Sequence, residues 1–278
     1  PQQNVVVQVP NYPPLRHAAG HWGLNKVELE FDAQADGTYA TPLETLRESL
    51  NGGGALLLSN PHNPLGKVFD REELQAVADV CLQQDAWIIS DEIHAELCYD
   101  GRVHIPVASL SPAIAARTIT LMSASKAFNI AGLKTAFMII QDPALLARVN
   151  HARCGLVDSV NPLGLEATRV AYADGGPWLA ELMTYLQSNR DFVVDAVRTR
   201  LPGVTINVPQ GTYLAWLDCS ALGLDNPQRF FLEQAKVGLS AGVEFGDHSQ
   251  QFVRLNFGCP RALLEEGIAR MQRSLLNR

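Results

Sequence analysis

The 278-residue sequence lacks long apolar runs, and its charged content is modest. Apolar runs such as residues 55–58 and 137–140 are strand-sized, far below the roughly 18 residues that a membrane-spanning helix needs. Apolar residues make up 47% of the chain and charged residues 18%, which excludes disorder, collagen and coiled coil as the main organisation. We therefore expect one large or two moderate globular domains and no membrane association.

Clustered positive charge is also missing. The chain has 22 Lys and Arg against 29 Asp and Glu, a formal net charge of −7, and its basic residues are scattered. A nucleic-acid-binding face needs clustered Lys and Arg, so we expect no nucleic-acid partner and no DNA-binding domain.

Cysteine is scarce and odd in number, at Cys81, Cys98, Cys154, Cys219 and Cys259. No two of them form a C-x-x-C pair, and no spacing of Cys and His is typical of a zinc site, so no metal is predicted. Reduced thiols of this kind are typical of cytoplasmic proteins, which is the location we expect.

In the first half of the chain, short apolar segments alternate with helical patterns. Strands are expected at residues 5–9, 27–31, 55–59, 87–90, 118–122 and 136–140. Thr41-Pro42-Leu43-Glu44 has the pattern of a capping box with proline at the first helical position, and Asp70 precedes a second helix. This alternation predicts a parallel sheet covered by helices on both faces.

The second half has longer helical patterns and fewer strands. Helices are expected at residues 162–173, 177–201, 227–236 and from 260 onward, and strands at 204–208, 213–218 and 252–256. We predict an α/β protein with a large domain over residues 1–180, built on a mostly parallel sheet, and a smaller α+β domain over residues 181–278. The long helical pattern ending near residue 201 connects them.

Polar clusters follow three successive strands, where ligands bind in open α/β sheets. They contain Asn63, Asp91, and then Ser123, Ser125 and Lys126. Taken singly, each has an ordinary explanation: a turn, a helix cap or a solvated lysine. Taken together, they suit pyridoxal 5′-phosphate, which needs a lysine for a Schiff base, an acid beside its ring nitrogen, a donor to its phenolic oxygen and ligands for its phosphate.

With these residues, the sequence resembles the fold-type I pyridoxal-phosphate enzymes, the aspartate aminotransferase superfamily, over essentially the whole chain. The resemblance implies a three-layer large domain and a homodimer. It implies that Asn63 bonds the phenolic oxygen and that Asp91 pairs with the ring nitrogen. It also implies that Lys126 is the Schiff-base lysine and moves protons at the substrate.

The same resemblance extends to the phosphate, the ring face and the substrate. It implies that Ser123 and Ser125 bind phosphate, and that Lys134 stands where the family usually has an arginine, keeping the charge without the bidentate fork. It implies that Tyr12 stacks on the cofactor ring, although a surface tyrosine anchoring a turn would look the same. It implies that Arg254 binds the substrate carboxylate, although an arginine on a half-buried strand can also pair internally.

Within the superfamily, the sequence is similar to the cystathionine β-lyases of the PatB/MalY type. The matching segments are 90–94 (SDEIH), 104–106 (HIP), 125–133 (SKAFNIAGL), 211–218 (GTYLAWLD) and 254–260 (RLNFGCP). Typical aminotransferases have tyrosine where His94 stands, so this residue favours a lyase. Alternatively, His94 only packs under the cofactor ring and moves no proton.

The resemblance implies a C–S lyase that releases thiol, pyruvate and ammonia from L-cystathionine or a related S-substituted cysteine. The alternative is an aminotransferase of class I or II, because the same residues serve both reactions. A second alternative is a pyridoxal-phosphate-binding regulator without turnover.

The family fold begins well before Tyr12, with a glycine-rich turn that cradles the cofactor phosphate at a helix N-terminus. Residues 52–54 (Gly-Gly-Gly) precede an expected strand rather than a helix, so they are not that turn. We therefore expect that the natural protein is longer than this chain, and that these residues alone bind the cofactor poorly.

Overall fold

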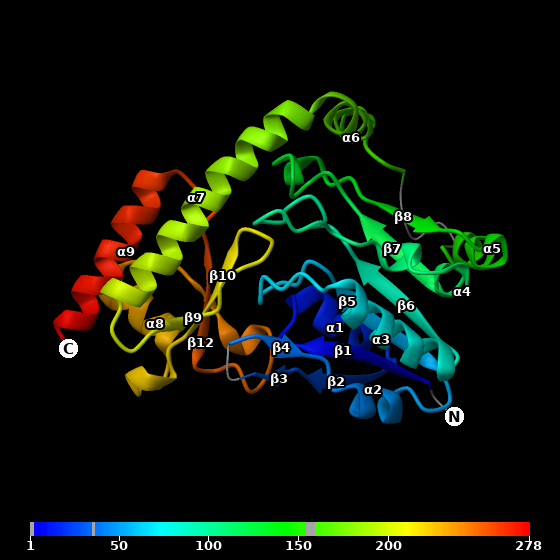
Figure 1. Ribbon diagram of the computed structural model, residues 1–278, viewed down its shortest axis with the longest axis horizontal. Coiled ribbons are helices and arrows are strands. Elements are labelled where there is room, and N and C mark those ends of the chain that lie inside the picture. Colours follow the sequence, from blue (N-terminus) through cyan, green and yellow to red (C-terminus); the bar gives the residue numbers. More distant parts are fainter. Residues whose placement is uncertain (1–2, 35–36, 154–158) are drawn as a thin grey trace.

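Two sheets, each with its own helices, form the two lobes of the computed structural model in Figure 1. The structure describes residues 3–34, 37–153 and 159–278. Cys154, one of the predicted thiols, lies outside the described residues, and the other four cysteines are free thiols. No helix in the described part of the chain is long and apolar enough to span a membrane.

The larger sheet has six strands in the order β2-β1-β5-β6-β7-β8. They are β1 (Asn4–Val9), β2 (Asn25–Glu30), β5 (Gly54–Ser59), β6 (Ala86–Asp91), β7 (Thr118–Met122) and β8 (Phe137–Ile140). The first five are parallel, and β8 is antiparallel to β7. The connection from β7 to β8 contains only the 3₁₀ turn Ala131–Leu133 and lacks the α-helix that usually carries a parallel crossover. The predicted mostly parallel α/β fold is confirmed.

Helices cover both faces of this sheet. Helices α2 (Leu43–Ser49), α3 (Arg71–Gln83) and α4 (Pro112–Ala115) contribute to the main core on one face. That core includes Val6, Leu46, Leu56, Leu74, Val77, Ile88 and Ile114. Helix α1 (Pro13–His21) lies on the other face, where Leu15 and Ala18 pack against a smaller cluster of Val7, Val9 and Leu57.

The predicted capping box at Thr41 is wrong. Helix α2 begins at Leu43 with Pro42 at the N-cap, and no side chain caps it. The Thr41 hydroxyl instead accepts a hydrogen bond from Gln8 Nε2 at 2.7 Å. Its oxygen is therefore used to join the helix entry to β1.

The capping box of α3 is present. Asp70 Oδ1 accepts from the Glu73 backbone N–H at 2.8 Å, and Glu73 Oε2 accepts from the Asp70 N–H at 3.1 Å. Because a lost N-cap costs about 1 kcal/mol, we expect Asp70→Ala to lower the free energy of unfolding by that amount. Urea unfolding would measure it. Asp70→Asn, which retains a capping oxygen, should be nearly neutral, and equal losses in the two variants would contradict the assignment.

The smaller sheet is antiparallel, in the order β11-β12-β10-β9. Its strands are β9 (Thr205–Ile206), β10 (Leu214–Asp218), β11 (Ser240–Ala241) and β12 (Phe252–Asn256). Helices α7 (Gly176–Arg200), α8 (Pro227–Phe230) and α9 (Arg261–Leu276) contribute to its core. Trp216 and Phe245 belong instead to the main core of the larger sheet, so the two sheets share packing.

Some elements differ from the prediction. The helix expected over residues 227–236 is divided into α8 and a π-helical turn, Phe231–Ala235. The remaining elements are β3 (Asp32–Ala33), β4 (Tyr39–Ala40), α5 (Pro143–Ala152), α6 (Pro162–Asp174) and the 3₁₀ turns Val107–Ser109, Ser220–Leu222 and Gly242–Glu244. The domain boundary predicted after residue 180 falls inside α7, which runs from beside α6 to the small-sheet lobe (Figure 1), and it stays a prediction.

Candidate active site

The carboxyl ends of β5, β6 and β7 lie side by side, because these strands are parallel neighbours. Asn63 follows β5, Asp91 ends β6, and Lys126 follows β7. The charge of Lys126 acts on the Asp91 carboxyl, and the charges of Lys126 and Arg254 both act on His94. The fold therefore brings these predicted residues to one edge of the sheet.

The Asp91 carboxyl is largely buried, and few neighbouring groups stabilise its negative charge. Burial raises the pKa of its carboxyl, while a hydrogen bond from the Ile93 N–H at 3.2 Å and the charge of Lys126 oppose that rise. A buried carboxylate is stabilised by a cationic donor. Asp91 is thus suited to hold a proton on a ring nitrogen.

His94 is a buried, neutral imidazole. Burial lowers its pKa to about 3, and the charges of Lys126 and Arg254 lower it further. Its ring lies edge-on to Tyr213, with centroids 5.7 Å apart, and its Nδ1 has no hydrogen-bond partner among the described residues. A buried nitrogen without a partner is costly, so this nitrogen is available to a bound group.

Arg254 is a half-buried cation without a matching anion. Its Nη1 donates to Asn63 Oδ1 at 2.8 Å and its Nη2 to Ser240 Oγ at 3.1 Å, while Nε makes no hydrogen bond with a described residue. Its guanidinium lies 4.7 Å from the centre of the Phe245 ring. No carboxylate in the described ranges forms an ion pair with it, so it can receive one from a ligand.

Ser240 and Phe245 were not identified from the sequence. Ser240 lies opposite Arg254 because β11 pairs with β12 in that register, and a two-residue strand leaves no periodic signal. Phe245 lies in a turn between these strands, where an aromatic residue carries no functional signal of its own.

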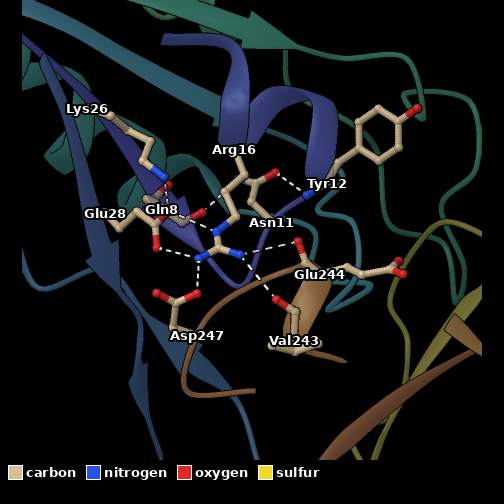
Figure 2. A network of polar contacts seen from close by, with 9 residues as sticks. All are labelled: Gln8, Asn11, Tyr12, Arg16, Lys26, Glu28, Val243, Glu244 and Asp247. Atoms are coloured by element: carbon tan, nitrogen blue, oxygen red, sulfur yellow. Dashed lines mark hydrogen bonds and ion pairs between the residues drawn. The ribbon is translucent and has the colours of Figure 1, made fainter. Parts of the chain in front are cut away.

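Tyr12 is the N-cap residue of α1, at the carboxyl end of β1. Its backbone N–H donates to Asn11 Oδ1 at 2.8 Å, and its side chain is 39% exposed. Figure 2 shows its ring pointing away from α1. The Tyr12 and Tyr213 phenols both act on the charge of the Arg254 guanidinium, so both lie near it. Stacking of Tyr12 on a cofactor ring stays a prediction.

The predicted phosphate ligands are less clearly arranged for binding than the residues expected at the cofactor ring. The buried Ser123 hydroxyl donates to the Thr135 carbonyl at 2.5 Å and accepts from the Ser125 N–H at 3.0 Å, so it holds the connection between β7 and β8. Lys134 is exposed, in the left-handed backbone region with φ of 49°. Phosphate binding by Ser123, Ser125 and Lys134 stays a prediction.

A cavity of about 320 Å³ lies beside Lys126. Trp178, Tyr185, Tyr213 and Asn256 are among its lining residues. A larger hollow of about 430 Å³, between β12, α9 and the turn before β11, contains none of the predicted site residues. The space beside Lys126 is therefore the candidate location for a substrate side chain.

These donors fit pyridoxal 5′-phosphate at its ring. Asp91 offers an acid for the ring nitrogen, and Lys126 an amine for the aldehyde. The amide nitrogen of Asn63 makes no hydrogen bond with a described residue, so it can donate to the phenolic oxygen while its carbonyl accepts from Arg254. The described side chains thus suit the ring of the cofactor, whereas phosphate binding by Ser123, Ser125 and Lys134 stays a prediction.

Comparisons with known proteins place the chain among similar sequences and structures. The family model described as aminotransferase class I and II matches residues 1–271. Cystathionine beta-lyase PatB of Bacillus subtilis is 38% identical over an alignment of 281 positions, which covers 99% of this chain and 72% of PatB.

Two solved structures are also similar. A C-S lyase of Staphylococcus hominis with bound pyridoxal phosphate has a TM-score of 0.93 at 31% identity, over 100% of this chain and 73% of that one. Cystalysin of Treponema denticola, which contains pyridoxal 5′-phosphate, has a TM-score of 0.95 at 29% identity, over 100% of this chain and 71% of cystalysin.

Proposed function

The chain belongs to the aminotransferase class I and II family, and from that premise we propose that it is a pyridoxal-phosphate-dependent C–S β-lyase. Its substrate is a small amino acid, L-cystathionine or a related S-substituted cysteine. The products are a thiol, pyruvate and ammonia. The observation that carries this proposal is the convergence of Lys126, Asp91 and Arg254 around one space, each with a charge that the protein leaves incompletely paired.

The cofactor supplies an electron sink for the bond electrons of the substrate Cα–H. Lys126 would hold the cofactor through its side-chain amine, and the same amine, when free, would take the proton from the substrate Cα. The C–S bond to the β-carbon then breaks, and the sulfur leaves with the electron pair and takes up a proton. The remaining three-carbon fragment is hydrolysed to pyruvate and ammonia.

The other residues orient the reactants. Asp91 would keep a proton on the ring nitrogen of the cofactor, and Arg254 would bind the substrate carboxylate so that the Cα–H bond faces Lys126. Neutral His94 carries no charge that would compete with Arg254 for the substrate carboxylate. Asn63 accepts a hydrogen bond from Arg254 and would donate one to the phenolic oxygen of the cofactor, which would link the substrate position to the ring.

The competing proposal is an aminotransferase of class I or II, because the family contains both kinds of enzyme. Two observations favour the lyase: the similarity to PatB and to the S. hominis C-S lyase, and His94 at the position where aminotransferases have tyrosine. A regulator without turnover is less favoured, because Lys126, Asp91 and Arg254, the three groups that the reaction needs, are all present.

The proposal is tested by identifying the thiol released from L-cystathionine by the gene product purified with pyridoxal phosphate. Breakage at the β-carbon of the cysteine half releases homocysteine, over many turnovers. Release of cysteine would mean that the other C–S bond breaks, and release of no thiol would leave the aminotransferase or the regulator.

Arg254 provides a test of substrate binding. Arg254→Met should raise KM for the amino acid roughly 10- to 100-fold, because a hydrogen-bonded ion pair contributes about 1.5–3 kcal/mol. Arg254→Lys should recover only part of the loss, because lysine lacks the bidentate fork. Steady-state kinetics measures both, and an unchanged KM in Arg254→Met would exclude this carboxylate site.

We also propose a cytoplasmic homodimer. The reduced state of the four described cysteines supports the location. Exposed apolar side chains on β8 and α6, among them Phe137, Met138, Leu163 and Leu165, support an interface on that side. Cell fractionation tests the location. Sedimentation of the gene product tests the assembly, and a monomer at micromolar concentration would contradict the dimer.

A further inference from the structure

Arg16, on α1, is a buried cation that joins three parts of the chain. Only 4% of it is exposed. Its Nε and Nη2 donate to the two oxygens of Glu28 on β2, both at 2.9 Å, and Nη2 also donates to Asp247 Oδ1 at 2.6 Å. Its Nη1 donates to the carbonyls of Val243 and Glu244 at 3.2 and 3.4 Å. Figure 2 shows the guanidinium at the centre of this network.

The network fixes one turn of the smaller sheet against α1. Val243, Glu244 and Asp247 belong to the turn between β11 and β12, residues 243–247. A backbone hydrogen bond from Asn11 to the Phe245 carbonyl at 2.8 Å adds a second attachment. The turn is therefore held by side-chain and backbone bonds from the segment that also carries Tyr12.

This turn supports the substrate-carboxylate residue. The centre of the Phe245 ring lies 4.7 Å from the Arg254 guanidinium, and the ring also packs edge-on against Trp216 with centroids 5.4 Å apart. Arg254 has no ion pair with a described residue that could set its direction. Its direction therefore depends on Asn63, Ser240 and the face of Phe245.

We propose that Arg16 is a positioning residue for substrate binding: it fixes the turn 243–247 so that Phe245 holds Arg254 in the direction that receives the substrate carboxylate. This inference rests on the proposed function, because it assumes that Arg254 binds a carboxylate. Arg16 touches neither substrate nor cofactor and acts only through the turn.

The test compares three variants of the enzyme loaded with its cofactor. Arg16→Met removes every bond that Arg16 makes to the turn and leaves the backbone bond from Asn11 to Phe245 in place. Asp247→Asn removes one charged bond to the turn and leaves the buried pair of Arg16 and Glu28 intact. Lys26→Met is the matched control, because Lys26 also pairs with Glu28 but is not bonded to the turn.

We expect Arg16→Met to raise KM for the amino acid about 10-fold with kcat within about 3-fold of the wild type, since ground-state alignment of the carboxylate is what it loses. Asp247→Asn should show a smaller rise in KM, and Lys26→Met none. Binding of the amine that lacks the carboxylate should be unchanged in all three. An unchanged KM in both Arg16→Met and Asp247→Asn, or an equal loss for acid and amine, would overturn the proposal.

Hydrogen exchange separates this inference from the proposed function. In the protein without substrate, Arg16→Met should speed exchange of the amides in residues 243–247 and 252–256, and Lys26→Met should not. If the wild type turns over no amino acid, the proposed function fails, and the exchange data alone decide whether Arg16 fixes the turn. If Arg16→Met does not fold, the KM and exchange rates of Asp247→Asn test the proposal instead. This variant is expected to fold, because the Asp247 carboxylate is exposed and is not part of the core.

Discussion

Replacing Lys126 by arginine should abolish turnover, with a loss in kcat of at least about 10⁴-fold, because the residue supplies both the covalent attachment and the base. Arginine keeps the positive charge and similar bulk but is not a nucleophilic amine at neutral pH. The visible absorbance of the lysine-attached cofactor should also disappear. The measurement is the turnover rate of the purified variant, together with its absorbance spectrum.

A matched control for this variant is Lys236→Arg, because Lys236 is exposed and lies away from the site. It should retain wild-type turnover and spectrum. Reduction with borohydride followed by peptide mass mapping should place the cofactor on Lys126 in both the wild type and this control. Attachment to any other lysine, or turnover above about 1% of wild type in Lys126→Arg, would refute the assignment.

Asp91→Asn should lower kcat by roughly 10²- to 10³-fold, the range found when one preorganised electrostatic partner is removed from an active site. Asparagine has nearly the same shape but cannot hold a proton on the ring nitrogen as an anion. Cofactor binding should weaken less than turnover, because the lysine attachment remains. Single-turnover kinetics with a saturating substrate measures the effect directly.

The same substitution should not destabilise the protein without cofactor. Burial raises the pKa of Asp91 in the folded state, so ionisation of this carboxyl favours unfolding. Asp91→Asn should therefore be at least as stable as the wild type above the raised pKa, and the advantage should vanish as the pH falls below the ordinary pKa of an aspartate. Thermal unfolding across this range measures it, with the exposed Asp195→Asn as control. A clear loss of stability at high pH would contradict the account.

The residues expected at the cofactor ring could be predicted from the sequence, because the parallel order of the strands brings their carboxyl ends to one edge of the sheet. Asn63, Asp91 and Lys126 each follow an apolar segment, and successive parallel strands end at one edge, so three local patterns are enough to bring them together. The antiparallel direction of β8 could not be predicted from the sequence, because it depends on the path of the connection between residues 122 and 137.

Contacts between distant segments could not be predicted. The oxygen of Thr41 is used by Gln8 rather than by its own helix, a competition that the local motif does not contain. Arg16 pairs with Glu28 on β2, which is 12 residues away in the sequence, and with Asp247 in the turn 243–247, which is 231 residues away. Such a network depends on the packing of the two sheets, so no spacing in the sequence indicates it.

The most direct test of the central claim counts pyruvate formed from L-cystathionine by the gene product with pyridoxal phosphate and no added keto acid. A β-lyase returns its cofactor unchanged after each cycle, so we predict steady formation over many turnovers, with ammonia in equal amount. The contrary result is no pyruvate, with substrate loss that stops after about one turnover per site until a keto acid is added. That outcome would make the chain an aminotransferase.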